Sequence, residues 1–247
     1  MTPRRWLSLL LIAVTLMVSL PSPAHARSLD FDGSNGTISF KQFGSLSGAT
    51  RLTWTAWINI DNVAVRTYFM QDFASTAFNI GIDSTVGNAG LRFDTHSNGG
   101  LLSIAATPPV GVWTHVAVRF DGTAAGGARA RFYLDGLLQT ITAENTGVNM
   151  GTVADTTIFQ LGATITSTFN GRMYNVKIFL DALTEEQIQA EMQCYRPQAT
   201  SLFFWAPLDG GDKVIADLAF GRLNSDITSG ISVSESTPPL DYCGAGG

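Results

Sequence analysis

Few side chains in this sequence could carry out chemistry, and His115 is the most prominent of them. It lies in the run WTHVAVRF at residues 113–120, where it alternates with Val116, Val118 and Phe120, and this pattern predicts a β-strand with one buried face. Nucleophilic catalysis would place a serine and a carboxylate beside the histidine, but the chain has no Gly-x-Ser-x-Gly nucleophile elbow. No glycine-rich phosphate loop leads from a strand into a helix either. The residues alone leave His115 open between chemistry and scaffold.

Carboxylates are the other candidates for catalysis. Cleavage of a glycosidic bond needs two carboxyl groups about 5–10 Å apart. Of the glutamates, Glu144 lies in a turn-like stretch, Glu235 lies near the end of the chain, and Glu185, Glu186 and Glu191 fall on an expected helix. None lies on an alternating strand, so we do not expect a hydrolase of that kind. We interpret the helix glutamates as cap, helix-dipole partner and solvated face.

Asp30 and Asp32 share one face of an expected strand and could form a paired carboxylate. We favour a different interpretation, in which the sequence DGSNG at 32–36 forms a turn whose side chains bond the local backbone. Oxygen ligands of this type also suit calcium, so one structural calcium ion is a prediction that we keep open. Its candidate ligands are Asp32, Asp61, Asn62 and Asp72.

A glycan-binding surface would need aromatic faces for sugar rings and planar polar groups for hydroxyls. Some candidates lie on strand faces opposite the expected core, and others lie near loops; for each, packing under a loop or a solvated rim is the competing interpretation. These candidates are Trp57, Asp72, His96, Asn98, Arg131 and Tyr133.

The start of the chain predicts export. A basic MTPRR segment precedes an apolar stretch at residues 6–20 and an A-x-A site at Ala24–Ala26, which is typical of a secretory signal peptide over residues 1–26. The alternative is an uncleaved anchor, but the apolar stretch is shorter than the roughly 20 residues of a membrane-spanning helix. We therefore predict a secreted protein (extracellular, on the cell surface or periplasmic) with no transmembrane segment after processing.

The net charge indicates which partners the protein can bind, and the two cysteines indicate a disulfide. The chain has 15 basic and 20 acidic residues, and removal of Arg4 and Arg5 would leave 13 against 20, a net charge of −7. Such a chain is a poor partner for nucleic acid. The two cysteines, Cys194 and Cys243, predict one disulfide in an exported protein; the alternative is a redox or metal pair.

The spacing of turn signals predicts an all-β fold. Clusters of glycine with aspartate or asparagine recur every 8–12 residues between short alternating runs, which favours an antiparallel sandwich or barrel. Asp135-Gly136 predicts a two-residue hairpin turn with positive φ at both positions. One segment differs, since Thr184 and Gln187 form a capping-box pattern that predicts a short helix near 184–193.

Four segments, in this order, resemble the laminin G-like family of the concanavalin-like lectin/glucanase superfamily. They are LDFDGSNGTISF, LTWTAWINI, GVWTHVAVRFDG with RFYLDGLL, and FNGRMYNVKIFLDALTEEQI, which together cover about residues 28–192. The resemblance implies a two-sheet antiparallel jelly-roll sandwich over residues 27–193. It also implies that His115 is scaffold, with its imidazole hydrogen-bonded to a neighbouring strand or loop.

The chain departs from the family at Tyr174, where the closing strand usually carries an acidic residue, and in its lack of an aromatic-Pro-Leu strand at the N-terminus. A similar run, FFWAPLDGGDKVIADLAFG, occurs at 203–221, so we predict that the extension 194–247 completes the sandwich and that this run pairs beside the N-terminal strand. The function that the resemblance implies is non-catalytic recognition of a carbohydrate or a cell-surface partner, including adhesion. A structural or assembly module and, less favoured, a glycoside hydrolase or lyase are the alternatives.

Overall fold

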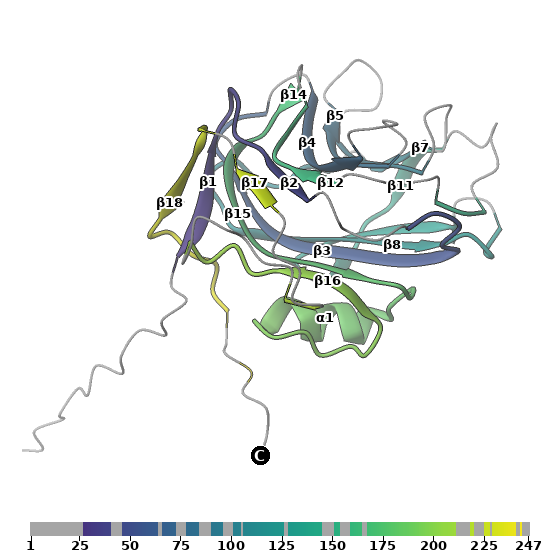
Figure 1. Cartoon of the computed structure of the whole chain (residues 1–247). Coiled ribbons are helices and arrows are strands. Elements are labelled where there is room, and N and C mark those ends of the chain that lie inside the picture. Colours follow the sequence, from purple (N-terminus) through teal and green to yellow (C-terminus); the bar gives the residue numbers. More distant parts are fainter. Residues whose placement is uncertain are drawn as a thin grey trace, which may run out of the picture.

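Two antiparallel sheets face each other, and one helix lies outside the sandwich (Figure 1). This architecture is a concanavalin-like jelly roll, as predicted. The computed structural model describes residues 27–40, 46–63, 66–72, 78–83, 90–95, 101–104, 106–125, 128–144, 151–153, 159–164, 167–210, 218–219, 225–227, 229–240 and 243. Within those residues, no helix has the length and apolar character needed to cross a bilayer.

The first sheet, sheet A, contains the longest strands. Its order is β10 (Leu137–Leu138), β9 (Ala130–Leu134), β8 (Thr114–Asp121), β3 (Arg51–Ile60), β15 (Asn170–Phe179), β1 (Ser28–Asp32) and β18 (Ile231–Ser234), while β16 (Leu202–Ala206) pairs with the far end of β15.

The second sheet, sheet B, lies across the core from sheet A (Figure 1). Its order is β11 (Ile141–Glu144), β7 (Leu101–Ile104), β6 (Gly90–Asp94), β5 (Asn79–Asp83), β4 (Arg66–Asp72), β12 (Phe159–Leu161), β2 (Ile38–Phe40) and β17 (Ser225–Ile227). A small ribbon of β13 (Ala163–Thr164) and β14 (Ser167–Thr168) completes the strands.

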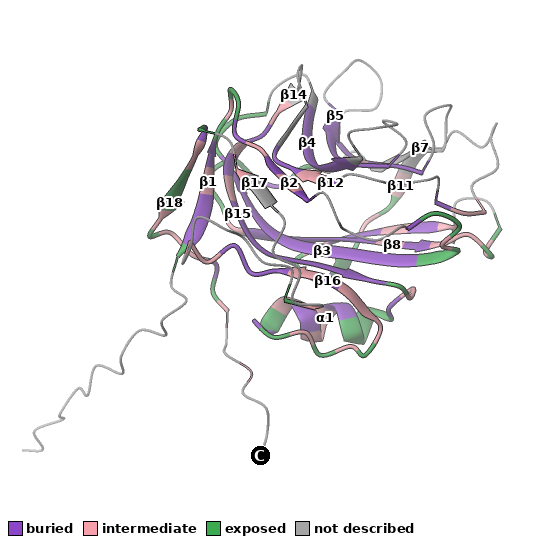
Figure 2. Ribbon diagram, in the orientation of Figure 1, coloured by how far each residue is buried: buried purple, intermediate pink, exposed green. Residues whose placement is uncertain are grey.

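Aromatic and branched side chains from both sheets form one core cluster. Figure 2 shows that most of the described strand residues of the two sheets are buried. Trp54 of sheet A and Phe69 of sheet B stack across the core with ring centroids 6.2 Å apart. The alternation predicted for WTHVAVRF is confirmed, because Val116, Val118 and Phe120 belong to this core. Burying such side chains contributes roughly 1.5–3 kcal/mol each, and this term dominates the stability of the sandwich.

Much of the outer face of sheet A is also buried, whereas an antiparallel sheet commonly leaves one face in contact with solvent. The helix α1 (Glu185–Gln193) lies across it (Figure 1). The capping box predicted at Thr184 and Gln187 is present, with Thr184 Oγ1 accepting from Gln187 N and Gln187 Oε1 accepting from Thr184 N. Sequence periodicity predicted which residues face outward on this sheet but not that a helix covers them.

A bulge in β15 controls what this outer face presents. The register of β15 against β3 shifts between Tyr174 and Lys177, and Asn175 at the bulge has φ of 54°. Asparagine tolerates this conformation better than most residues. The extra residue lets Tyr174 and Lys177, three positions apart, both point outward, where Tyr174 joins an aromatic cluster in place of the acidic residue typical of the family.

The segment after Cys194 contributes strands to both sheets. The prediction for residues 203–221 was wrong about the partner strand, because β16 pairs with β15, whereas the strand that pairs with β1 is β18, farther along the chain. Residues Val176–Phe179 pair with β16 and residues 170–173 pair with β1, so the two strands follow each other along one edge of β15. The sequence of a short aromatic run does not indicate which of these two positions along β15 the run will occupy.

Candidate functional site

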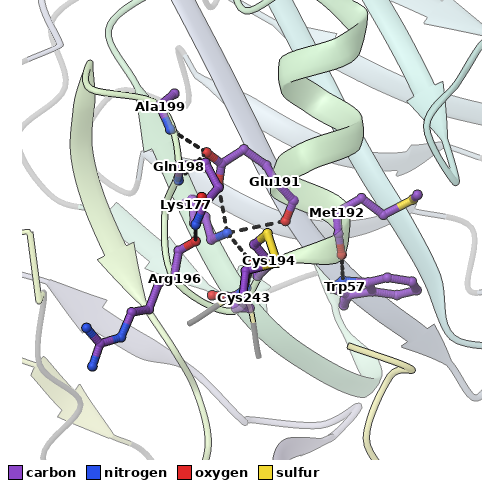
Figure 3. Close-up of a disulfide and its surroundings, with 10 residues drawn as sticks. Trp57, Lys177, Glu191, Met192, Cys194, Arg196, Gln198, Ala199 and Cys243 are labelled. Carbon is purple, nitrogen blue, oxygen red and sulfur yellow. Dashed lines mark hydrogen bonds and ion pairs between the residues drawn. A yellow bond between two sulfur atoms is a disulfide. The ribbon is translucent and has the colours of Figure 1, made fainter. Parts of the chain in front are cut away.

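A cluster of aromatic side chains lies on the outer face of sheet A, between the sheet, the end of α1 and the C-terminal segment. Trp57, Tyr174 and Tyr195 form the buried centre of this cluster. Partly buried side chains pack against them, namely Trp113, Met192, Trp205 and Leu240. Trp57 is held in place by the hydrogen bond from its Nε1 to the Met192 carbonyl, at 3.1 Å (Figure 3).

Beside this cluster is an open pocket of about 350 Å³. It is lined by Trp57, Trp113, Asp135, Met192, Gln193 and Pro239. Two indoles and the apolar Met192 and Pro239 form most of the wall, and Asp135 and Gln193 supply a carboxylate and an amide. A concave, mostly apolar pocket with a few convergent polar groups is the usual form of a small-molecule site.

The position of Asp135 follows from the hairpin turn. Asp135 and Gly136 have φ of 49° and 74°, which confirms the predicted pair of positive φ values. Asp135 Oδ1 accepts a hydrogen bond from the backbone N–H of His115 at 2.8 Å, and Asp135 N donates to the His115 carbonyl. The turn thus fixes the carboxylate at one end of the pocket.

His115 itself does not have the surroundings of a catalytic base. Its side chain is 1% exposed, and its ring meets the ring of Trp57 edge-on, with centroids 5.5 Å apart. Burial, together with the nearby charge of Lys177, lowers the pKa of His115 to about 3. In the described part of the chain, its Nδ1 has no hydrogen-bond partner, so the expected bond from the imidazole to a neighbouring strand or loop is not made at this atom and stays a prediction for Nε2.

The end of α1 that borders the pocket is fixed by a buried ion pair (Figure 3). Lys177 Nζ lies 2.7 Å from Glu191 Oε2 and also donates to the Cys194 carbonyl at 2.9 Å. Glu191 Oε1 accepts from the backbone N–H groups of Gln198 and Ala199, each at 2.7 Å. The interpretation of the helix glutamates as cap, dipole partner or solvated face was therefore wrong for Glu191, which is 1% exposed.

The predicted disulfide between Cys194 and Cys243 forms in the structure. Figure 3 shows this disulfide at the end of α1. Cys194 is the C-cap residue of the helix and follows directly after Gln193, which lines the pocket. The bond therefore ties the C-terminal segment to the helix end beside the pocket.

Of the predicted glycan contacts that lie within the described residues, Trp57 lines the pocket. Tyr133 is buried under α1 with Leu183 and Ile188. Arg131 pairs in register with Arg119 on the neighbouring strand and does not line the pocket.

The other three predicted glycan contacts are Asp72, His96 and Asn98, and the structure describes one of them, Asp72. Asp72 ends β4 in sheet B, on the other layer of the sandwich, and His96 and Asn98 lie outside the described residues. Trp113, Asp135 and Gln193 were missed as contacts. A signal for Trp113 existed, since it alternates with His115 on the same face as Trp57.

Two of the four calcium candidates, Asp32 and Asp61, have other partners in the structure. Asp32 accepts hydrogen bonds from Ser34 N, Ser34 Oγ and Asn35 N, which lower the pKa of its carboxyl group to about 2 and make the turn that we favoured. Asp61 forms an ion pair with Arg172. No group of three or more His, Cys, Asp or Glu side chains that could hold a metal occurs among the described residues.

A calcium requirement remains testable on the whole protein. We expect EDTA to leave the melting temperature unchanged, because the carboxylates of Asp32 and Asp61 already have hydrogen-bond or ion-pair partners. Thermal unfolding with EDTA and with excess calcium measures this. A fall in melting temperature on chelation that calcium reverses would instead support an ion that includes Asp72 or Asn62.

A second set of polar side chains lies on the outer face of sheet B. Cross-strand register aligns Ser39, Gln160, Gln71, Asn79 and Asp94 in one row. Gln160 Nε2 donates to Ser39 Oγ at 2.8 Å, and Arg92 pairs with both Asp83 and Asp94. Because these groups bond to one another, the row is better explained as a self-satisfied polar surface than as an empty ligand site.

Comparison with known families agrees with the architecture. A laminin G-type family model, described as the concanavalin A-like lectin/glucanases superfamily, matches residues 32–189, more than half of the chain. The chain belongs to this superfamily. No curated protein matches this lectin/glucanase-like chain in a sequence search.

Solved structures with this lectin/glucanase-like fold include proteins from three organisms. A Bacteroides ovatus protein with a provisional assignment as a carbohydrate-binding protein shares 22% identity at a TM-score of 0.67, over 87% of this chain and 61% of its own length. A heptameric SAP-like pentraxin of Limulus polyphemus shares 16% identity at a TM-score of 0.61, over 87% of this chain and 97% of its own length. Domain 4 of the arabinanase AbnA of Geobacillus stearothermophilus, in complex with arabinotriose, shares 20% identity at a TM-score of 0.51, over 67% of this chain and 76% of its own length.

This chain thus spans less than two thirds of the Bacteroides ovatus structure. At these identities the likeness shows a shared fold.

Proposed function

We propose that this chain is an exported, non-catalytic carbohydrate-binding module and that the pocket beside Trp57 and Trp113 is its sugar site. The observation that carries the proposal is the combination of two indoles with the planar polar groups of Asp135 and Gln193 around one open pocket. This is the arrangement of side chains that suits a sugar ring, which has apolar C–H faces and a rim of hydroxyl groups.

Each side chain has a distinct part in the proposed contact. Trp113 is only partly buried, so its indole offers an apolar surface to a ring. Asp135 would accept hydrogen bonds from hydroxyls, and the Gln193 amide can both donate and accept. Trp57 also lines the pocket but is 6% exposed, so it offers less surface to a sugar than Trp113 does. None of the side chains that the structure describes in the pocket lining is a cation, so a neutral or weakly basic sugar fits better than a strongly acidic one.

Several observations support binding without catalysis. Among the described residues that line the pocket, Asp135 is the one carboxylate, whereas glycoside hydrolysis commonly uses two. On sheet B, Asp83 and Asp94 lie on either side of Arg92 and pair with it, so they do not face each other across a space that a substrate could enter. Detection of glycan cleavage by the purified protein would contradict this part of the proposal.

Export and attachment to a cell surface are further parts of the proposal. The disulfide between Cys194 and Cys243 suits an oxidising compartment, and so does the signal-peptide pattern at residues 1–26. Among relatives of the fold, the arabinotriose-bound arabinanase domain and the Bacteroides ovatus protein support a glycan as the partner.

A glycan array followed by calorimetry tests the proposal. We expect Trp113→Ala to weaken binding of the strongest array hit at least about tenfold, because an aromatic anchor is lost. We expect Asp135→Asn to weaken it about fivefold, since a neutral acceptor replaces a charged one. Asparagine keeps the acceptor for His115 N and tolerates the positive φ at this position.

Leu137→Ala is the matched control, because Leu137 is 64% exposed on the same hairpin and does not line the pocket. It should bind like the wild type. Absence of binding to any glycan at high protein concentration would contradict the proposal and favour a structural or assembly module.

A further inference from the structure

The C-terminal segment crosses the outer face of sheet A and takes part in the pocket. We define the strap as residues 234–240 together with Cys243. Its path begins at the end of β18, which pairs with β1. Ser28 Oγ then donates to the Ser236 carbonyl at 2.6 Å, and Trp113 Nε1 donates to Ser236 Oγ at 3.0 Å. Ser236 therefore joins β1 at the edge of the sheet to the indole at the pocket.

The strap also supplies apolar contacts. Pro239 forms part of the pocket wall, and Leu240 packs against the aromatic cluster around Trp57. The orientation of Trp113, the most accessible aromatic group of the pocket, therefore depends on the hydrogen bond that it donates to the strap, and one side of the pocket is the strap itself.

The two ends of the strap are held in different ways. One end continues from β18 and keeps its ladder to β1. The other end is held by Cys243, whose disulfide partner is Cys194 (Figure 3). Cys194 lies on a well-anchored helix end, because its carbonyl accepts from Lys177 Nζ and from Asn175 Nδ2. Loss of the disulfide would thus release Cys243 and leave Cys194 in place.

We propose that the strap is a component of the sugar site and that the Cys194–Cys243 disulfide holds it there, so that the pocket is complete only in the oxidised protein. The inference rests on the proposed function for its ligand. Opening requires a dithiol reductant, which passes two electrons to the sulfur–sulfur bond; the bond breaks, two cysteine thiols form, and the reductant becomes its own disulfide. The two sheets keep their own core, so the sandwich stays folded while the strap leaves.

Acrylamide quenching of tryptophan fluorescence tests the strap without any sugar. We expect reduction by dithiothreitol, or the double variant Cys194→Ser/Cys243→Ser, to increase quenching, because Trp113 loses its cover and its bond to Ser236. Dithiothreitol should have no further effect on the double variant. Circular dichroism in the far ultraviolet should stay unchanged. Unaltered quenching after complete reduction would overturn the inference, and so would global unfolding of the reduced protein.

Measuring sugar binding by the oxidised and the reduced protein distinguishes a failure of the strap proposal from a failure of the proposed function. With arabinotriose or the neutral oligosaccharide of the array that binds most tightly, we expect reduction to weaken binding at least about tenfold. Ser236→Ala should also weaken binding with the disulfide intact, Ser236→Thr should restore it, and Ser232→Ala on exposed β18 should have no effect. Equal binding by oxidised and reduced protein would overturn the inference and leave the proposed function standing. Failure of the oxidised protein to bind would overturn the proposed function, and quenching would then decide whether the strap opens.

Discussion

Replacement of Glu191 by glutamine is expected to destabilise the protein by about 3–5 kcal/mol, the cost of removing one partner from a buried ion pair. Glu191 uses both carboxylate oxygens, one for Lys177 Nζ and one for the backbone N–H groups of Gln198 and Ala199. A glutamine has one acceptor oxygen, so it must leave either the ammonium group or the N–H groups without their partner. Urea unfolding followed by circular dichroism measures the difference.

Two further variants make this prediction specific. Glu186→Gln changes an exposed glutamate in the first turn of the same helix and should alter stability little. Adding Lys177→Met to Glu191→Gln should recover part of the lost stability, because burial already lowers the pKa of Lys177 against the opposing influence of Glu191, and methionine removes the buried charge. Wild-type stability for Glu191→Gln would mean that the pair does not form.

Acidification is expected to destabilise the protein through His115. In the unfolded chain a histidine has a pKa near 6.5, whereas burial lowers the pKa of folded His115 to about 3. Between these values the unfolded state binds a proton that the folded state does not. The contribution is therefore fully present above pH 6.5 and is lost as the pH falls toward 3. From about pH 7.5 to about pH 5 this amounts to about 2 kcal/mol.

The variant His115→Leu isolates this contribution. Leucine is apolar, so it suits the buried position against Trp57 and does not titrate. Urea unfolding at both pH values should show a fall in stability about 2 kcal/mol smaller for the variant than for the wild type. Comparison at each pH removes the influence of carboxylates common to both proteins. An identical fall in both proteins would show that His115 is not buried as a neutral ring.

The sheets could be predicted from the sequence because their determinants are local. Alternation of Val116, Val118 and Phe120, the Asp135-Gly136 turn and the Thr184 capping box each act within a few residues. The pairing of β16 (residues 202–206) with β15 could not be predicted. Both β1 and β16 pair along the same edge of β15, and no local sequence pattern distinguishes the two positions.

The candidate site was harder to predict because it depends on contacts far apart in the chain. Trp57 and Trp113 alternate on an outward face, which normally indicates solvent or a loop; only the position of α1 turns that face into a pocket wall. Glu191 has the appearance of a solvated helix residue until the bulge at Asn175 places Lys177 opposite it. Gln193 reaches the pocket at the end of α1, and Pro239 reaches it from a segment far along the chain that the disulfide ties to this helix end.

Titration of the ¹⁵N-labelled, oxidised protein with its best oligosaccharide tests the central claim most directly, since each tryptophan indole gives its own N–H resonance. The pocket predicts shifts for Trp113 and Trp57, with Trp54 in the core and Trp205 outside the pocket little changed. Shifts confined to the side-chain amides of Gln71, Asn79 and Gln160 on sheet B, with unmoved indoles, would contradict it.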